Sequence, residues 1–164
     1  MILGIDPGNS LSAYCFCNSD TMQPVAFGKI PNEELMATVI PKINDYAMEA
    51  VAIEHIQSYG MTVGKEVFDT CVFIGRLLER IERTMPNVRI QPVYRKDEKL
   101  AIVGNLHAND TIIRHSLIDM FAKHDFKNGK GVKAKPDFFF GLKADCWSAF
   151  AVAYSARLQM EGKI

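Results

Sequence analysis

The sequence predicts an α/β fold in which a mixed five-stranded sheet is flanked by helices. Residues 1–7, 11–17 and 23–30 have the apolar, β-branched and turn-bounded pattern of three consecutive strands. Consecutive strands joined by short turns pair as antiparallel hairpins. Two later strands, at 50–54 and 88–94, alternate with helices, as strands added in parallel to a sheet do.

The length and composition favour one soluble domain spanning residues 1–164. A chain of 164 residues buries about two thirds of its unfolded surface on folding. The hydrophobic share of 48% and the charged share of 23% are typical of globular proteins. No apolar run approaches the roughly 20 residues of a membrane span, and an acid and Pro-Gly follow too early for a signal peptide. We therefore expect no membrane association.

The first two predicted helices come from the middle of the chain. Glu33–Tyr46 has helical spacing of apolar residues, with Asn32 as the predicted N-cap, and Pro41 should kink or split it. Lys65–Arg83 is the clearest helix. Its predicted apolar stripe consists of Val67, Cys71, Ile74, Leu78 and Ile81.

The C-terminal part is predicted to hold two helices and a long loop. Asn109–Lys123 is a helix with Asn109 as its N-cap, residues 124–142 form a loop rich in lysine and glycine, and residues 143–160 form the last helix. The four cysteines lack metal-binding spacing. We expect Cys15, Cys17, Cys71 and Cys146 to be small buried hydrophobic residues in a reducing compartment, which favours the cytoplasm.

The charges cancel in sum but not in distribution. The chain has 19 basic and 19 acidic side chains, and a zero net charge by itself argues against a nucleic-acid partner. Six lysines nevertheless fall between Phe121 and Lys143 against two acids, and Arg95, Lys96 and Lys99 form a second basic cluster. Lys127, Lys130 and Lys133 are either a DNA-binding loop or a solvated surface loop.

Three acids stand where predicted elements begin or end. Asp6 ends the first strand, Glu54 ends the fourth, and Asp145 lies in the first turn of the last helix. Parallel neighbouring strands would bring Asp6 and Glu54 to one sheet edge. Mg²⁺ prefers carboxylate ligands, and two such ions can promote phosphodiester hydrolysis. Each acid also has an ordinary interpretation, as a turn former, a solvated strand end or a helix-dipole partner.

Four segments together resemble a known family. Ile2-Leu3-Gly4-Ile5-Asp6-Pro7-Gly8-Asn9-Ser10 looks like the opening of RuvC-like Holliday junction resolvases, and Val51-Ala52-Ile53-Glu54 resembles their second acidic strand. The segment 102–110 is similar to their glycine-containing loop before a helix. The segment 145–153 resembles their last helix, which carries Asp-x-x-Asp-Ala. The four segments occur in family order, and the resemblance covers nearly the whole chain.

The resemblance implies a ribonuclease H-like fold, a homodimer, and nicking of branched DNA with two Mg²⁺ ions, for which Mn²⁺ can substitute. Asp6, Glu54 and Asp145 match the acidic catalytic metal ligands of the family. Ser148 stands where one register places the last aspartate, as a weak ligand. A shifted register places Asp145 there, and Asp137 is another candidate for the fourth ligand. The short chain with a basic loop resembles phage or prophage members, which implies the cytoplasm of a bacterium or an infected host.

The resemblance also suggests DNA contacts and a dimer surface. The family has a lysine near the start of the helix after the glycine loop, and here Lys99 or His107 would contact phosphate instead. Tyr59 is placed to stack on bases or wedge between them, or else simply packs in its loop. The helix 65–83 is the candidate for dimerisation, and it also has to cover the sheet.

Three competing functions share parts of this pattern. A ribonuclease H-like nuclease with another substrate would use the same acids. An actin-like ATP-binding protein opens with a similar strand, but it needs two such domains. A non-catalytic branched-DNA-binding protein of the same fold would explain Ser148 in place of an acid.

Overall fold

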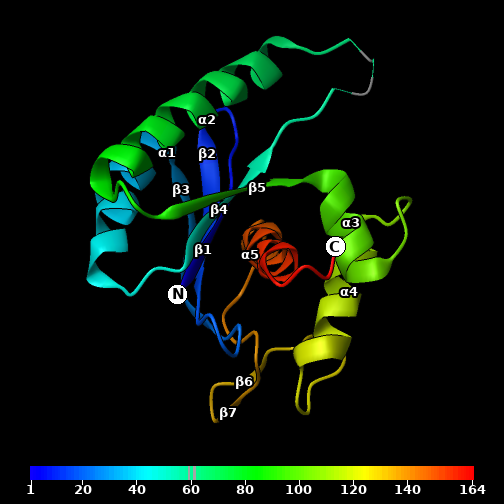
Figure 1. The fold of residues 1–164 in the computed structure, drawn as a ribbon. Coiled ribbons are helices and arrows are strands. Elements are labelled where there is room, and N and C mark those ends of the chain that lie inside the picture. The colour runs from blue at the N-terminus through cyan, green and yellow to red at the C-terminus, as the bar shows by residue number, and fades with distance from the viewer. Residues whose placement is uncertain (59, 61) are drawn as a thin grey trace.

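The computed structural model describes residues 1–58, 60 and 62–164, and it confirms the mixed five-stranded sheet. The strands are β1 (Ile2–Asp6), β2 (Leu11–Cys17), β3 (Pro24–Pro31), β4 (Ala50–His55) and β5 (Arg89–Tyr94), in the spatial order β3-β2-β1-β4-β5. As the sequence predicts, β1 pairs antiparallel with β2 and β2 with β3, whereas β4 is parallel to both β1 and β5. Figure 1 shows helices on both faces of this sheet.

The register of the central strands places two acids side by side. Ile5 of β1 is opposite Ile53 of β4, so the next residues, Asp6 and Glu54, leave the sheet at the same edge. Gly4 lets the last helix, α5 (Cys146–Met160), lie directly on β1. A Cβ atom at Gly4 would lie 2.1 Å from the Ala149 carbonyl oxygen, a separation that no side chain allows.

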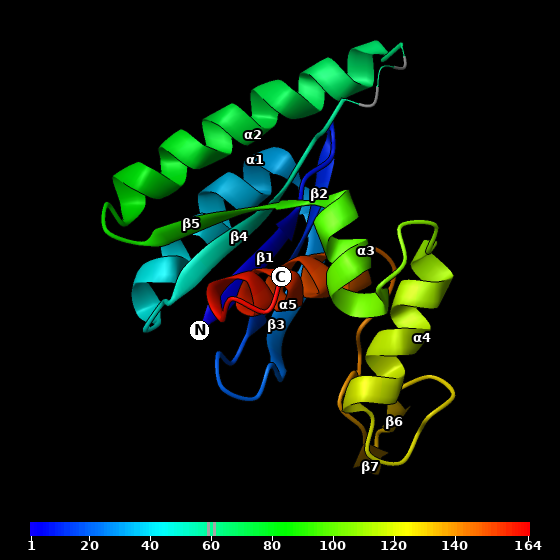
Figure 2. The same ribbon diagram turned by 45° about the vertical axis from the view of Figure 1, so that its right-hand side comes forward.

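Each face of the sheet has its own apolar core. Ile2 packs with buried residues of α5, α4 (Asp110–Phe121) and α3 (Arg95–Val103), including Leu117 and Phe150. Leu3 and Ile5 point the opposite way, because side chains alternate along a strand, and pack with residues of α2 (Lys65–Thr84). Figure 2 shows α5 against the sheet, with α3 and α4 beside it.

The segment after β3 is split, as Pro41 predicts. It consists of α1 (Asn32–Glu34), a π-helical turn (Leu35–Val39) and a 3-10 turn (Ile40–Asp45). The predicted N-cap role of Asn32 is wrong, because Pro31 is the cap residue and no side chain caps this helix. The Asn32 amide instead accepts from Ser12 Oγ (2.7 Å) and donates to the Gly8 carbonyl (3.0 Å). These bonds fix the turn that follows Asp6.

The phase of α2 differs from the predicted stripe. The buried residues are Thr70, Phe73, Ile74, Leu77 and Ile81. Cys71 is exposed, so the expectation of four buried cysteines is wrong for this one. The helix also carries apolar residues on its outer side, so the spacing of apolar residues alone does not indicate which side is buried. Phe68 and Val72 on that side are 60% and 65% exposed.

One helix was not predicted at all. Arg95–Val103 forms α3 and ends at Gly104, whose φ of 71° is the left-handed conformation common after helices. The next helix, α4, has the predicted cap, because Asn109 Oδ1 accepts the Ile112 N–H at 3.0 Å. None of the helices in the described residues is long and apolar enough to cross a membrane.

The lysine-rich segment after α4 is more ordered than the predicted loop. It contains the hairpin β6 (Gly131–Val132) and β7 (Lys135–Pro136), organised around the buried Asp137. The Asp137 carboxylate accepts backbone N–H groups at 2.6–2.9 Å. The donors are residues Lys123, His124, Asp125 and Phe138.

Candidate active site

Asp6 and Glu54 form a half-buried carboxyl pair at the end of β1 and β4. The pKa of Asp6 is raised to about 8, chiefly by burial and then by the charge of Glu54 and a hydrogen bond between the two side chains. Burial also raises the pKa of Glu54, and the charge of Glu98 adds to this. The pair thus retains a proton near neutral pH. Perturbed carboxyl groups of this kind are concentrated at functional sites.

Glu98 is the acid that sequence reasoning missed. It lies on α3, is 1% exposed, and its Oε1 accepts from Arg95 Nη1 at 2.6 Å. Its Oε2 has no hydrogen-bond partner among the described residues. Burial raises the pKa of Glu98, and the neighbouring Arg95 opposes that shift. The available signal was helical spacing, since Glu98 and Ile102 lie one turn apart on the buried side of α3.

Asp145 lies near this pair but is bound elsewhere. The prediction placed it in the first turn of the last helix, whereas it is the N-cap residue, one position before α5 begins, and it forms an ion pair with Lys29 of β3. Its side chain is 47% exposed. The charge of Asp145 still contributes to the raised pKa of Asp6, so the two carboxyl groups are within electrostatic range. Asp145 is therefore adjacent to the pair without completing a compact triad.

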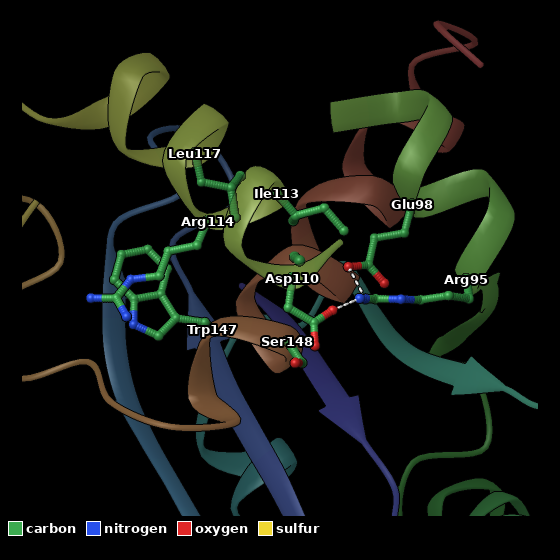
Figure 3. Close-up of a pocket in the computed structure, with 9 residues that line it drawn as sticks. Arg95, Glu98, Asp110, Ile113, Arg114, Leu117, Trp147 and Ser148 are labelled. Carbon is green, nitrogen blue, oxygen red and sulfur yellow. Dashed lines mark hydrogen bonds and ion pairs between the residues drawn. The ribbon is translucent and has the colours of Figure 1, made fainter. Parts of the chain in front are cut away.

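Arg95 is a cation of the cleft whose charge acts on both Asp6 and Glu54. Figure 3 shows its guanidinium between Glu98 of α3 and Asp110 at the start of α4, with an ion pair to each. Its charge lowers the pKa values of both Asp6 and Glu54, against the larger effect of burial. Arg95 therefore partly neutralises a group of acids that would otherwise repel one another.

An open cleft of about 550 Å³ connects these residues. It is lined by Asp6, Glu54, Arg95, Lys99, His107, Ala108, Asn109, Asp110 and Ser148. The structure therefore brings five predicted residues together, namely the two acids, Ser148, Lys99 and His107. Tyr59 lies outside the described residues. Lys127 and Lys130 come just before β6, and Lys133 lies between β6 and β7. Figure 2 shows β6 and β7 beside the C-terminal end of α4, the end away from Asp110.

The carboxyl pair fits a divalent cation, although no complete ligand set is assembled. Two neighbouring carboxyl groups repel each other when both are ionised, so one of them keeps a proton. A hard divalent cation bound between them would relieve the same repulsion. Within the part of the chain that the structure describes, no group of three or more His, Cys, Asp or Glu residues is arranged to hold a metal ion. Asp6 and Glu54 could hold one ion, and Asp145 or Glu98 would have to leave its present partner to join them.

Asp137 is not a fourth ligand. Burial by itself raises the pKa of its carboxyl group, but the four backbone N–H donors together outweigh burial and hold the pKa well below its usual range. Both oxygens are already used in these bonds. The alternative in which Asp137 supplies the missing acid is therefore wrong.

The fold is a ribonuclease H-like α/β arrangement, with two acids at the edge of its central strands. Among solved structures, the chain is similar to RuvC of Thermus thermophilus, with a TM-score of 0.68, 16% identity, and coverage of 98% of this chain and 96% of that one. The structure of T. thermophilus RuvC in complex with a Holliday junction substrate matches equally well, with a TM-score of 0.68 and coverage of 98% and 95%. The chain therefore has the RuvC fold, as the sequence resemblance implies. No protein-family model and no curated protein matches the sequence.

Proposed function

We propose that this chain is a metal-dependent endonuclease that nicks Holliday junctions or other branched DNA. The observation that carries the proposal is the half-buried carboxyl pair of Asp6 and Glu54 on a RuvC fold. The similar T. thermophilus protein has been captured with a Holliday junction substrate, which supports branched DNA as the substrate here.

Asp6 and Glu54 are the residues that would hold Mg²⁺ or Mn²⁺. When bound, a divalent ion supplies Lewis-acid chemistry at the scissile phosphate. Asp145 would serve a second ion after it separates from Lys29, with Ser148 as a weak neighbouring ligand. This exchange is reasonable because an ion pair with an exposed lysine contributes little stability.

DNA would contact basic side chains both in the cleft and away from it. Lys99 and His107 line the same cleft as the acids and are placed to bind phosphate. The twelve residues of α4, about 18 Å of helix, lie between the cleft and the lysine-rich segment that follows this helix. We therefore propose Lys127, Lys130 and Lys133 as contacts to a more distant part of the same DNA. The role proposed for Tyr59, stacking on a base, rests on the sequence alone.

We also propose a homodimer that uses the outer face of α2. Phe68 and Val72 form an exposed apolar strip there, and Cys71 lies between them in sequence. A two-fold dimer would present two cleavage sites to the two opposed strands of a junction. Sedimentation of the wild-type chain beside Phe68→Ser/Val72→Ser tests this, since the variant should be monomeric.

The function is tested by cleavage of a synthetic four-way junction with Mg²⁺ or Mn²⁺, in parallel with duplex DNA and an RNA–DNA hybrid. We expect paired nicks in the junction, lost in Asp6→Asn. Cleavage of the hybrid with the junction left intact would instead indicate a ribonuclease H-like enzyme with another substrate.

A second candidate is a branched-DNA-binding protein that does not cleave. It is favoured by one observation, the pairing of Asp145 with Lys29 in place of a third ligand next to Asp6. Tight junction binding with no nicking in either metal, at any pH between about 6 and 9, would support it over the nuclease.

A further inference from the structure

We infer that Arg95 binds a backbone phosphate of DNA in the cleft. In the absence of DNA, Asp110 pairs with the guanidinium of Arg95 and so competes with that phosphate. This rests on the proposed function in so far as it requires DNA in the cleft. It adds a substrate-binding residue and a self-inhibitory contact that the sequence did not indicate.

The two acidic partners of Arg95 differ sharply in their surroundings. The Glu98 side chain is 1% exposed and bonds to Nη1 at 2.6 Å, whereas the Asp110 side chain is 82% exposed and pairs with Nη2. The Arg95 side chain itself is 29% exposed, so its outer edge remains accessible to solvent. These exposures put Glu98 on the buried side of the guanidinium and Asp110 on its solvent side. Figure 3 shows both carboxyl groups paired with it.

This difference decides which contact can be exchanged. Breaking the inner pair would leave a buried carboxylate uncompensated, which is strongly unfavourable, and Glu98 Oε2 already lacks a partner among the described residues. The outer pair is a surface ion pair, which contributes little. We therefore expect Glu98 to hold Arg95 in place while Asp110 gives way.

A phosphate fits the position that Asp110 would leave. Guanidinium groups bind phosphate and carboxylate oxygens with the same planar, two-pronged geometry, so an aspartate can stand in for a phosphate. The position also adjoins the N-terminus of α4, where backbone N–H groups and the helix dipole favour an anion. Arg95 and Asp110 line the same cleft as Asp6 and Glu54, so the bound phosphate would lie near the carboxyl pair.

The alternative is that Arg95 only joins α3 to α4. In that case the loss of Asp110 would lower thermal stability and leave DNA affinity unchanged. The two interpretations predict opposite outcomes for one substitution, Asp110→Asn, which keeps the size of the side chain and removes its charge.

The test measures binding of the full chain to a fluorescent four-way junction in Ca²⁺, over a series of salt concentrations. We expect Asp110→Asn to bind about three- to tenfold more tightly than wild type. The matched control is Asp119→Asn, which removes the same charge from an exposed position on the same helix and should change affinity less than about twofold. Arg95→Ala should bind at least about tenfold more weakly, with a salt slope reduced by about one ion.

Arg95→Ala leaves Glu98 unpaired and is checked for folding by circular dichroism, with Arg95→Lys as the second variant. Lysine keeps a positive charge beside Glu98 but cannot form two parallel hydrogen bonds to a phosphate, so we expect an affinity for the junction between those of wild type and Arg95→Ala. Equal affinities of Asp110→Asn and Asp119→Asn would overturn the inference even if the wild type nicks junctions. Absence of DNA binding or nicking by the wild type would instead be a failure of the proposed function.

Discussion

Asp6 and Asp137 are two aspartates withdrawn from solvent in opposite surroundings. Asp6 is half-buried beside another carboxyl group, with a third acid, Asp145, in electrostatic range. Asp137 is 6% exposed and surrounded by four backbone N–H donors. The pKa of the first is raised to about 8, and the pKa of the second is held far below its usual range.

The difference shows that burial alone does not identify a functional acid. Burial raises the pKa of both groups, and the sign of the final shift depends on what else surrounds the carboxyl group. Hydrogen-bond donors make Asp137 a structural anchor for the lysine-rich hairpin. A second carboxyl group in place of donors leaves Asp6 poorly compensated, which is why we propose a cation there.

The largest expected effect is the loss of DNA cleavage that the substitution Asp6→Asn causes. Asparagine offers only a neutral oxygen to a metal ion, so we expect nicking to fall by about 1,000-fold, equivalent to several kcal/mol of lost metal assistance. Nicking rates on the four-way junction measure this. Asp119→Asn is the matched control, and it should cleave at the wild-type rate. A residual rate in Asp6→Asn within about tenfold of wild type would remove Asp6 from the chemistry.

The corresponding substitution at the other aspartate, Asp137→Asn, should act on stability. The new amide N–H₂ would face backbone N–H donors, so several charge-assisted hydrogen bonds disappear, and we expect the free energy of unfolding to fall by about 2–4 kcal/mol. Urea denaturation measures the change, again beside Asp119→Asn. A change under about 0.5 kcal/mol would show that the hairpin does not depend on this carboxylate.

The two aspartates should also give opposite dependences of stability on pH. The folded-state pKa of Asp6 is raised, so its unfolded form loses the proton first, and stability falls as pH rises from about 4 to about 8. The folded-state pKa of Asp137 is lowered, so its contribution is present above about pH 4 and declines as pH falls below that.

Thermal melts in metal-free buffer from about pH 3 to 9 separate these contributions. Asp6→Asn should lose most of the decline between about pH 4 and 8, and Mg²⁺ should raise the melting temperature more at about pH 8 than at about pH 5, because only the ionised pair binds it. When the Mg²⁺ concentration is about 100 times its Kd, binding adds about 2.7 kcal/mol to the free energy of unfolding of the wild type. The same Mg²⁺ effect in Asp6→Asn would place the ion elsewhere.

The smallest expected effect concerns the lysine-rich segment around Asp137, which contains the hairpin of β6 and β7. Each of Lys127→Ala, Lys130→Ala and Lys133→Ala should weaken junction binding a few-fold and lower the salt slope by about 0.9 for each phosphate that the variant no longer neutralises. Binding titrations at several salt concentrations measure this, with Lys42→Ala on the 3-10 turn as the control. Unchanged slopes in all three variants would identify the lysine-rich segment as a solvated surface.

Several elements were predictable because local patterns specify them. The alternation and turns of the first three strands, the cap at Asn109 and the break at Pro41 are set by residues within a few positions of one another. The helix α3 was missed because its buried side carries Glu98 beside Ile102, so the apolar repeat that marks a helix is interrupted. Cys71 was misplaced because α2 carries apolar residues on two sides.

Local sequence patterns were enough to specify the mixed sheet and the meeting of Asp6 with Glu54, since parallel neighbouring strands bring their ends to one edge. The packing of distant elements specified which other groups join them. Glu98 and Arg95 arrive through the packing of α3, and Asp145 pairs with Lys29, 116 positions away in the chain. Asp137 is held beside the hairpin by four backbone N–H donors, and the pattern of side chains in the sequence does not reveal such donors. Such contacts depend on the three-dimensional arrangement of helices and strands, and residue patterns within a few positions carry no record of that arrangement.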